Sequence, residues 1–450
     1  MTKLVKSTSG VRGIVFDGLH PAMATRYGAA FGTLLKSGRV VVGRDSRPSG
    51  EVLMPSVIAG LRSVGIEVIE IGIVPTPTVE IAVQKLRAAG GICITASHNP
   101  AQWNALKFFN NRGEFITPTQ YRKLDNIFEK QKFAYKPHAG MGEISTQDNW
   151  VEEHVRQTLA LKVVKRAAVK RRRFKVVVDA VNGAGSLALP LLLRKLGVSV
   201  VELNCRGDGD FVREPEPVAG NITGLARAVK KHRADLGMAC DPDADRLALV
   251  DEKGRPAGEE LTLALAAAAV LSSRRGPTVI NLSTSKVTVD TARSCGSKVY
   301  YSKVGEANVV QMMRRKKAVI GGEGNGGVIY PAFHAGRDAL VAAALVLSHL
   351  AGEKTTLSKL VSTFPAYYTV KTKGRLRGNF TSRLKSFEKE IRRLVGKTRV
   401  DRRDGLRFDF DQGWVQIRAS NTEPIYRVIV ETRSRTFSQR LSVKVTKFFS

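Results

Sequence analysis

A serine followed by a histidine, Ser97-His98, is the first place in this chain where side chains could carry out group transfer. The pair lies in the hexapeptide 95–100, after the apolar run 91–94, and Lys107 follows ten residues after the serine. We expect a buried strand to end here and a loop to begin. A hydroxyl with a base and positive charge nearby can carry a phosphoryl group. A capped turn also uses these residue types, so the motif alone leaves both interpretations open.

Three aspartates, Asp241, Asp243 and Asp245, occupy alternate positions and are followed by Arg246. On an extended backbone their carboxylates point the same way and repel one another, which a divalent cation would relieve. Oxygen ligands of this kind suit Mg²⁺. A calcium loop would need glycine where Arg246 stands, and residues 247–250 look like a strand. A solvated acidic turn is the remaining alternative.

The glycine-rich segment 321–327 presents only two side chains, Glu323 and Asn325. Its glycines would let a ligand approach the backbone closely. A carboxylate and an amide suit adjacent sugar hydroxyls. A flexible turn between strands predicted at 318–320 and 328–330 is equally consistent with the pattern.

A fourth polar segment, 418–424, combines a guanidinium, two hydroxyls and an amide in one turn, followed by a second arginine. Such a group makes an anion cradle, with a solvated turn as the alternative. The segment 7–13 is a weaker version of the same chemistry. The candidate residues are Arg12, Arg418, Ser420, Asn421, Thr422 and Arg427.

A recurring order of strand, glycine-rich turn and helix must position these segments. Strands are predicted at 40–45, 67–72, 175–179 and 278–282, and helices at 51–64 and 187–196. This rhythm predicts three related α/β domains with mixed, mainly parallel sheets. It ends near residue 366, where strands at 367–372 and 414–417 and a helix at 382–394 predict a smaller C-terminal α+β domain. The expected domains are 1–150, 151–254, 255–365 and 366–450.

The composition is that of a globular protein, with 450 residues, 43% of them hydrophobic and 25% charged. Four scattered cysteines without a C-x-x-C pair predict reduced thiols in the cytoplasm. The N-terminus lacks the apolar region of a signal peptide. The apolar run 261–271 is too short for a bilayer and predicts a buried helix, so we expect no membrane partner.

The net charge is unusual, because 72 lysines and arginines against 40 acidic residues leave +32. Basic runs lie at 170–173, 314–317 and 402–403. They are spread along the chain without interleaved aromatic residues, so we interpret them as solvated surfaces and do not expect a nucleic-acid partner. The positive field would also gather an anionic substrate. An alternative of another class is a basic nucleic-acid-binding protein with a decayed catalytic site.

The four segments, in this order and at these intervals, resemble the α-D-phosphohexomutase superfamily over essentially the whole chain. That superfamily includes phosphoglucomutase, phosphomannomutase and phosphoglucosamine mutase. The resemblance implies four domains around a central cleft, each giving one loop. It also implies an isomerase that interconverts hexose 6-phosphate and hexose 1-phosphate through a phosphoserine enzyme and a hexose 1,6-bisphosphate. The implied partner is a phosphosugar, and the implied assembly a monomer or homodimer.

The resemblance assigns a role to each candidate residue. Ser97 would carry the phosphoryl group and would bind Mg²⁺ together with Asp241, Asp243 and Asp245. Lys107 would be the general acid/base, with Arg12 flanking the transfer site and His98 and Arg246 in support. Glu323 and Asn325 would bind sugar hydroxyls. The distal phosphate would lie on Arg418, Ser420, Asn421, Thr422 and Arg427.

The third loop departs from many family members, which carry serine and then histidine where this chain has Asn325 and Gly327. We expect the missing histidine contact to be absent or supplied by another residue such as His334. Residues 102–108 resemble a subgroup assigned to phosphoglucosamine mutase, which is the expected activity. Glucose and mannose phosphates stay open as substrates.

Overall fold

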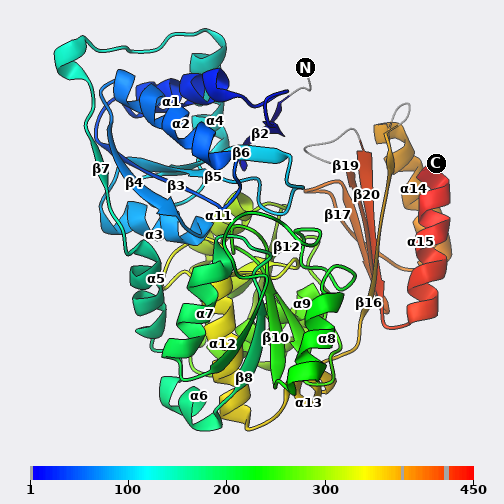
Figure 1. The fold of residues 1–450 in the computed structure, drawn as a ribbon. Coiled ribbons are helices and arrows are strands. Elements are labelled where there is room, and N and C mark those ends of the chain that lie inside the picture. The colour runs from blue at the N-terminus through cyan, green and yellow to red at the C-terminus, as the bar shows by residue number, and fades with distance from the viewer. Residues whose placement is uncertain (1–3, 377–379, 420–424, 450) are drawn as a thin grey trace.

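The computed structural model describes residues 4–376, 380–419 and 425–449, and its strands form four sheets (Figure 1). The first sheet has seven strands in the order β1-β2-β6-β5-β3-β4-β7. Its strands are β1 Val5–Ser7, β2 Gly10–Ile14, β3 Arg39–Arg44, β4 Glu67–Ile73, β5 Gly90–Ile94, β6 Trp103–Asn110 and β7 Ile144–Thr146. Its helices are α1 Pro21–Leu35, α2 Gly50–Ser63, α3 Thr76–Lys85 and α4 Pro118–Glu129, and a 3₁₀ turn covers His138–Gly140.

The second sheet has the order β11-β10-β8-β9 and the third β13-β12-β14-β15. The second unit contains β8 Lys175–Asp179, β9 Ser199–Leu203, β10 Leu236–Cys240, β11 Leu247–Asp251, α5 Trp150–Leu159, α6 Arg166–Arg172, α7 Gly185–Lys195 and α8 Thr223–His232. The third contains β12 Thr278–Asn281, β13 Val299–Ser302, β14 Ile320–Glu323, β15 Gly327–Ile329, α9 Glu259–Leu271, α10 Lys286–Ser294, α11 Glu306–Lys316, α12 Ala339–Glu353 and α13 Leu357–Ser362.

The fourth sheet is wholly antiparallel, in the order β16-β20-β19-β18-β17. Its elements are β16 Tyr368–Arg375, β17 Arg399–Asp401, β18 Leu406–Phe410, β19 Gly413–Ala419, β20 Ile425–Thr432, α14 Phe380–Val395 and α15 Arg435–Phe449. The predicted fold class, three α/β units and a smaller C-terminal unit, is confirmed.

The first three units share one arrangement of four strands, which explains the rhythm seen in the sequence. Three parallel strands are followed by an antiparallel fourth: β4-β3-β5-β6, then β9-β8-β10-β11, then β13-β12-β14-β15. The Ser97 segment connects β5 to β6, the aspartate segment connects β10 to β11, and the glycine-rich segment connects β14 to β15. Three of the four candidate segments therefore lie at the same topological position.

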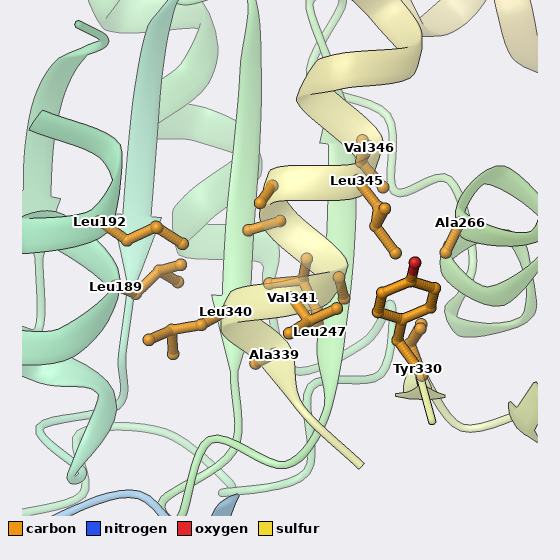
Figure 2. Packing of buried hydrophobic residues seen from close by; sticks show 14 of the residues in the cluster. Leu189, Leu192, Leu247, Ala266, Tyr330, Ala339, Leu340, Val341, Leu345 and Val346 are labelled. Carbon is orange, nitrogen blue, oxygen red and sulfur yellow. The ribbon is translucent and has the colours of Figure 1, made fainter. Parts of the chain in front are cut away.

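Helices α9 and α12, which have apolar residues on every side, form the centre of the core. Helix α12 is buried along most of its length, and it packs against α7 and α9. Leu340 faces Leu189 and Leu192 of α7, while Leu345 lies near Tyr330 and Ala266 on the opposite side (Figure 2). A helix that is apolar all round must be covered on all sides. The first three units consequently share one hydrophobic cluster, whereas the fourth has its own.

The glycine-rich segment differs from its prediction. The strand expected at 318–320 is β14, which starts at Ile320 and takes in Gly321, Gly322 and Glu323. A Cβ atom at Gly321 would lie 2.4 Å from the carbonyl oxygen of Val279. These two glycines therefore allow close packing within the sheet, and they are not part of a ligand-binding loop as the sequence had suggested.

The predicted helix at 261–271 is confirmed as α9 and is buried. Among the described residues, no helix combines the length and apolarity needed to cross a bilayer.

Candidate active site

A cleft of about 580 Å³ receives residues from all four units. Nine of the sequence-predicted residues line it directly. Arg12, Ser97, His98, Lys107, Arg246, Glu323, Asn325, Arg418 and Arg427 line it, and the aspartate triad reaches it through Ser97. Ser420, Asn421 and Thr422 lie outside the described residues.

Ser97 has a backbone conformation that presents its hydroxyl to the aspartates. Its φ of 49° lies in the left-handed region, which is costly for a side chain other than glycine. The side chain is buried, and Oγ donates to Asp241 Oδ2 at 2.8 Å. His98 Nδ1 lies 3.3 Å from the same oxygen. One hydroxyl is thus fixed between an imidazole and a carboxylate.

The three aspartates form a buried group whose carboxylate oxygens lie within 4.8 Å of one another. Asp243 Oδ1 and Asp245 Oδ1 are buried and form no hydrogen bond to any described residue. Burial and the neighbouring charges of Asp245 and Asp243 raise the pKa of Asp241 well above its usual range. Carboxylate oxygens without a hydrogen bond from the described residues, next to a hydroxyl, match the oxygen ligands that Mg²⁺ takes. The donor set therefore fits a divalent cation.

Lys107 is the cation that touches the triad from the first unit. Its Nζ lies 2.5 Å from Asp243 Oδ2 and 3.7 Å from Asp245 Oδ2. Burial alone would favour the neutral amine, but the charges of Asp243 and Asp245 outweigh it and raise the pKa of Lys107. Lys107 is accordingly an ammonium group in this arrangement, able to donate a proton.

His98 has the opposite electrostatic environment. Removal from water, together with the positive charges of Arg246, Arg12 and Arg337, lowers its pKa well below the usual value. Its imidazole is therefore neutral and can accept a hydrogen bond. Arg12 Nη1 donates to Asn99 Oδ1 at 3.1 Å, which places that guanidinium beside the serine loop.

Arg337, which sequence reasoning missed, joins the aspartate loop to the glycine-rich segment. It pairs with Asp245 at 2.6 Å, Glu306 at 2.8 Å and Glu323 at 3.0 Å. Glu323 also accepts from Asn281 Nδ2 at 2.7 Å and from a backbone N–H at 2.9 Å. No sequence pattern marked Arg337, because its partners come from separate parts of the chain.

A row of three cations crosses the fourth sheet at the cleft. Arg418 on β19 pairs in register with Arg427 on β20, which pairs with Lys373 on β16. All three line the cleft. Arg418 Nε is buried without a hydrogen-bond partner among the described residues. Like charges directly opposite each other destabilise a sheet, so this row is suited to an anion. Lys373 was also missed by sequence reasoning, since it lies 45 residues before Arg418.

Comparison with known proteins agrees with this geometry. Four family models match in order: phosphoglucomutase/phosphomannomutase α/β/α domain I at 3–135, domain II at 152–254, domain III at 258–368 and the C-terminal domain at 376–447. The chain belongs to the phosphoglucomutase/phosphomannomutase family. The resemblance to α-D-phosphohexomutases and the predicted enzyme class, a phosphohexomutase isomerase, are thereby confirmed.

Family members with different names are similar to the chain over nearly its whole length. A phosphoglucomutase/phosphomannomutase of Thermococcus kodakarensis is 40% identical, covering 95% of this chain and 94% of that protein. A probable phosphoglucosamine mutase of Methanopyrus kandleri is 35% identical, covering 96% and 95%. The crystal structure of a phosphoglucomutase/phosphomannomutase family protein from Burkholderia thailandensis superposes with a TM-score of 0.86 at 27% identity, covering 98% and 97%.

His334 does not supply the histidine contact that this phosphohexomutase lacks in its third loop. It is buried away from the cleft lining, with Nδ1 at 3.1 Å from Glu80 and Nε2 at 2.9 Å from Asp338. His154 reaches the same Asp338 oxygen at 2.9 Å and Thr78 at 2.9 Å. The group connects α3, α5 and the start of α12, so its role is structural.

The pH dependence of stability tests this buried group. Burial alone would lower the pKa of His334, but Asp338 and Glu80 raise it from 6.5 to about 10. Because the pKa of His334 is higher in the folded protein, protonation of its ring stabilises the fold. This stabilisation is complete below the unfolded-state pKa of 6.5 and is lost as the pH rises through about 10. We expect the free energy of unfolding to fall by roughly 2 kcal/mol or more over this range.

His334→Gln removes the titrating ring and should flatten this decline while lowering stability at pH 6.5. Urea unfolding at pH 6.5 and 9.5 measures both effects. His138→Gln, at an exposed histidine, is the matched control and should follow the wild-type profile. A His334→Gln profile as steep as that of the wild type would contradict the assignment.

Proposed function

We propose that this chain interconverts hexose 6-phosphate and hexose 1-phosphate by passing a phosphoryl group through Ser97. The observation that carries the proposal is the Ser97 hydroxyl, fixed 2.8 Å from Asp241 in a cleft that is also lined by a row of three cations. A phosphoryl group on Ser97 and a second phosphate on the cation row would face each other across one sugar. That arrangement suits a substrate with phosphates at both ends.

In the proposed cycle, phosphorylated Ser97 gives its phosphoryl group to the free hydroxyl of a hexose monophosphate. The resulting hexose 1,6-bisphosphate turns end over end, and its other phosphate returns to Ser97. Lys107 Nζ gives a proton to the Ser97 oxygen as its bond to phosphorus breaks and takes up the proton of the attacking hydroxyl, so it remains an ammonium group. Neutral His98 accepts a hydrogen bond beside it. Arg12 and Arg246 neutralise the transferred group, which is the main way proteins accelerate phosphoryl transfer.

Asp241, Asp243, Asp245 and the oxygen of Ser97 would hold Mg²⁺. When bound, the ion would withdraw charge from the phosphoryl oxygens in the transition state. The supporting observation is the pair of buried carboxylate oxygens that accept no hydrogen bond from the part of the chain that the structure describes. Glu323 and Asn325 would bind sugar hydroxyls, and Arg418 and Arg427, together with Ser420, Asn421 and Thr422, would bind the phosphate that is not transferred.

The four functional units would be the domains 1–150, 151–254, 255–365 and 366–450, each with its own sheet. We further propose a cytoplasmic protein, supported by four free cysteines, two of them buried. Its partner would be a phosphosugar, it would work as a monomer or homodimer, and nucleic acid would not be needed for activity.

For the sugar, we propose glucosamine phosphate, with glucose and mannose phosphates as the alternative. The stretch 102–108 supports glucosamine, and so does similarity to relatives named probable phosphoglucosamine mutase. The 40% identical phosphoglucomutase/phosphomannomutase supports the alternative. Coupled assays with the three 6-phosphates and 1-phosphates decide between them through the ratio of kcat/KM.

The phosphoserine proposal predicts that Ser97 becomes phosphorylated during incubation with a hexose 1,6-bisphosphate and Mg²⁺. Intact mass and peptide mapping would detect the added phosphate. Ser97→Ala should lower kcat by several orders of magnitude with an unchanged circular dichroism spectrum, because the residue lies in a loop. Ser56→Ala, at a helical surface position, serves as the control. An unlabelled wild-type Ser97 would contradict the proposal.

The metal proposal predicts opposite stability effects for two members of the triad. Asp241→Asn and Asp243→Asn should both abolish Mg²⁺ binding in calorimetry and mutase activity. In EDTA, Asp241→Asn should be at least as stable as the wild type, because burial and the repulsion of Asp245 and Asp243 disfavour the charged form of that carboxyl and raise its pKa. Asp243→Asn should be less stable, because buried Lys107 loses the nearer of its two ionic partners.

Asp208→Asn, at an exposed aspartate of the same unit, is the control for both substitutions. Retained Mg²⁺ affinity in either triad variant would count against a metal role for that carboxylate.

The cation row predicts a shared loss of binding and rate. Arg418→Ala should raise KM and lower kcat, because the distal phosphate positions the reacting end. Arg418→Lys should recover only part of the loss, since an ammonium lacks the guanidinium fork. Lys373→Ala should raise KM several-fold. Exposed Lys444 on α15 supplies the control, Lys444→Ala, and its kinetics should match those of the wild type. Unchanged kinetics in Arg418→Ala would contradict a role of the C-terminal unit in substrate binding.

A further inference from the structure

A buried arginine behind the serine loop, Arg47, has no place in the chemistry described so far. It does not line the cleft, and its side chain is 1% exposed. It lies between β3 and α2, three residues after the end of the strand. A buried guanidinium is retained in a protein only when it is fully paired.

All five N–H groups of Arg47 are used, four of them on the serine loop. Nη2 donates to the carbonyl oxygens of Ser97 and Asn99, both at 2.7 Å. Nη1 donates to those of Pro100 and Trp103, at 2.9 and 3.0 Å. Nε donates to Asp45. Four carbonyl groups within seven residues therefore converge on one side chain.

Asp45 completes the arrangement from the N–H side of Ser97. Its Oδ2 accepts from Arg47 at 3.1 Å and from Thr95 Oγ1 at 2.6 Å, and Thr95 Oγ1 in turn accepts the N–H of Ser97 at 3.0 Å. The side chain of Asp45 is fully buried. Both peptide groups that flank the Ser97 Cα are thus held by one buried ion pair.

The second unit covers this ion pair. Phe211 stacks on the guanidinium, with 4.8 Å from its ring centre to Cζ. Ser46 donates to the carbonyl oxygen of Asn182 at 2.8 Å. A Cβ atom at Gly209, whose φ is +75°, would lie 2.2 Å from the carbonyl oxygen of Ser46. The segment that contains Gly209 therefore packs directly against the backbone of Ser46, with no room for a side chain.

We propose that Arg47 and Asp45 are positioning residues for phosphoryl transfer, which hold Ser97 in its left-handed conformation while the group arrives and leaves. The inference rests on the proposed phosphoserine role of Ser97. A left-handed serine costs free energy. Without the clamp formed by Arg47 and Asp45, the loop would relax and carry Oγ away from Asp241. A displacement of about 1 Å at a reacting atom can cost on the order of 100-fold in rate. Because Arg47 is outside the cleft, sugar binding should be spared.

The test compares Arg47→Lys with Arg44→Lys. Arg44 is a buried neighbour that donates to the carbonyls of Asp45 and Arg47 but not to residues 97–103. Rapid-quench labelling with a hexose 1,6-bisphosphate measures the phosphorylation rate of the serine, and hydrogen exchange measures protection of residues 95–103. For Arg47→Lys we expect at least 100-fold slower labelling, a similar fall in kcat, KM within about 3-fold and faster local exchange. Arg44→Lys should leave all four quantities near wild type.

Thr95→Val provides a nearly isosteric second variant if Arg47→Lys folds poorly. It breaks the link between Ser97 N–H and Asp45, and it should slow labelling at least 10-fold at unchanged KM. Unlabelled wild type would refute the phosphoserine proposal itself. Labelled wild type, with Thr95→Val and a folded Arg47→Lys labelled equally fast, would overturn the clamp alone. Loss of kcat with unchanged labelling and local exchange would also overturn it.

Discussion

Three carboxylates buried within 4.8 Å of one another are the constraint on which the arrangement of this protein depends. Such a group is tolerable only when positive charge surrounds it. Lys107 of the first unit, Arg246 of the second and Arg337 of the third all lie within ion-pair distance of the triad. Balancing the charge therefore fixes the three units relative to one another.

The same constraint connects packing with chemistry. In each of the first three units the functional segment connects the last parallel strand to the antiparallel strand beside it. Three similar sheets therefore converge on one point. The apolar helix α12 packs the second and third units together. The group His154, Asp338, His334 and Glu80 connects these two units to the first. The fourth unit has its own core and meets the others through polar contacts such as Lys371 with Glu259. A polar interface between units of one chain permits relative motion of those units.

The basic runs of the sequence have a local explanation. The runs at 170–173 and 314–317 stand at the C-terminal ends of α6 and α11, and Lys230 and Lys231 stand at the end of α8. Cations at this end of a helix are stabilised by the helix dipole and by free carbonyl groups. The third run, 402–403, is paired with Glu388 and Asp401. These positions make the basic runs part of helix and turn structure, in agreement with their interpretation as solvated surfaces.

The sequence by itself determined the elements and the reactive groups, because both are encoded locally. Runs of β-branched residues specify β3, β8 and β12, and the alternating aspartates and the Ser-His turn are legible without a structure. Even so, β14 extended beyond its predicted end, since parallel pairing with β12 draws glycines 321 and 322 into the sheet.

Tertiary structure alone decided which distant residues complete the site. Arg337 gathers carboxylates from three segments, Lys373 aligns with Arg427 across two strands, and Arg47 holds a loop fifty residues away. Tertiary structure also decided that His334 serves the core. Sheet register and domain packing create these contacts, and no local pattern records which strands become neighbours.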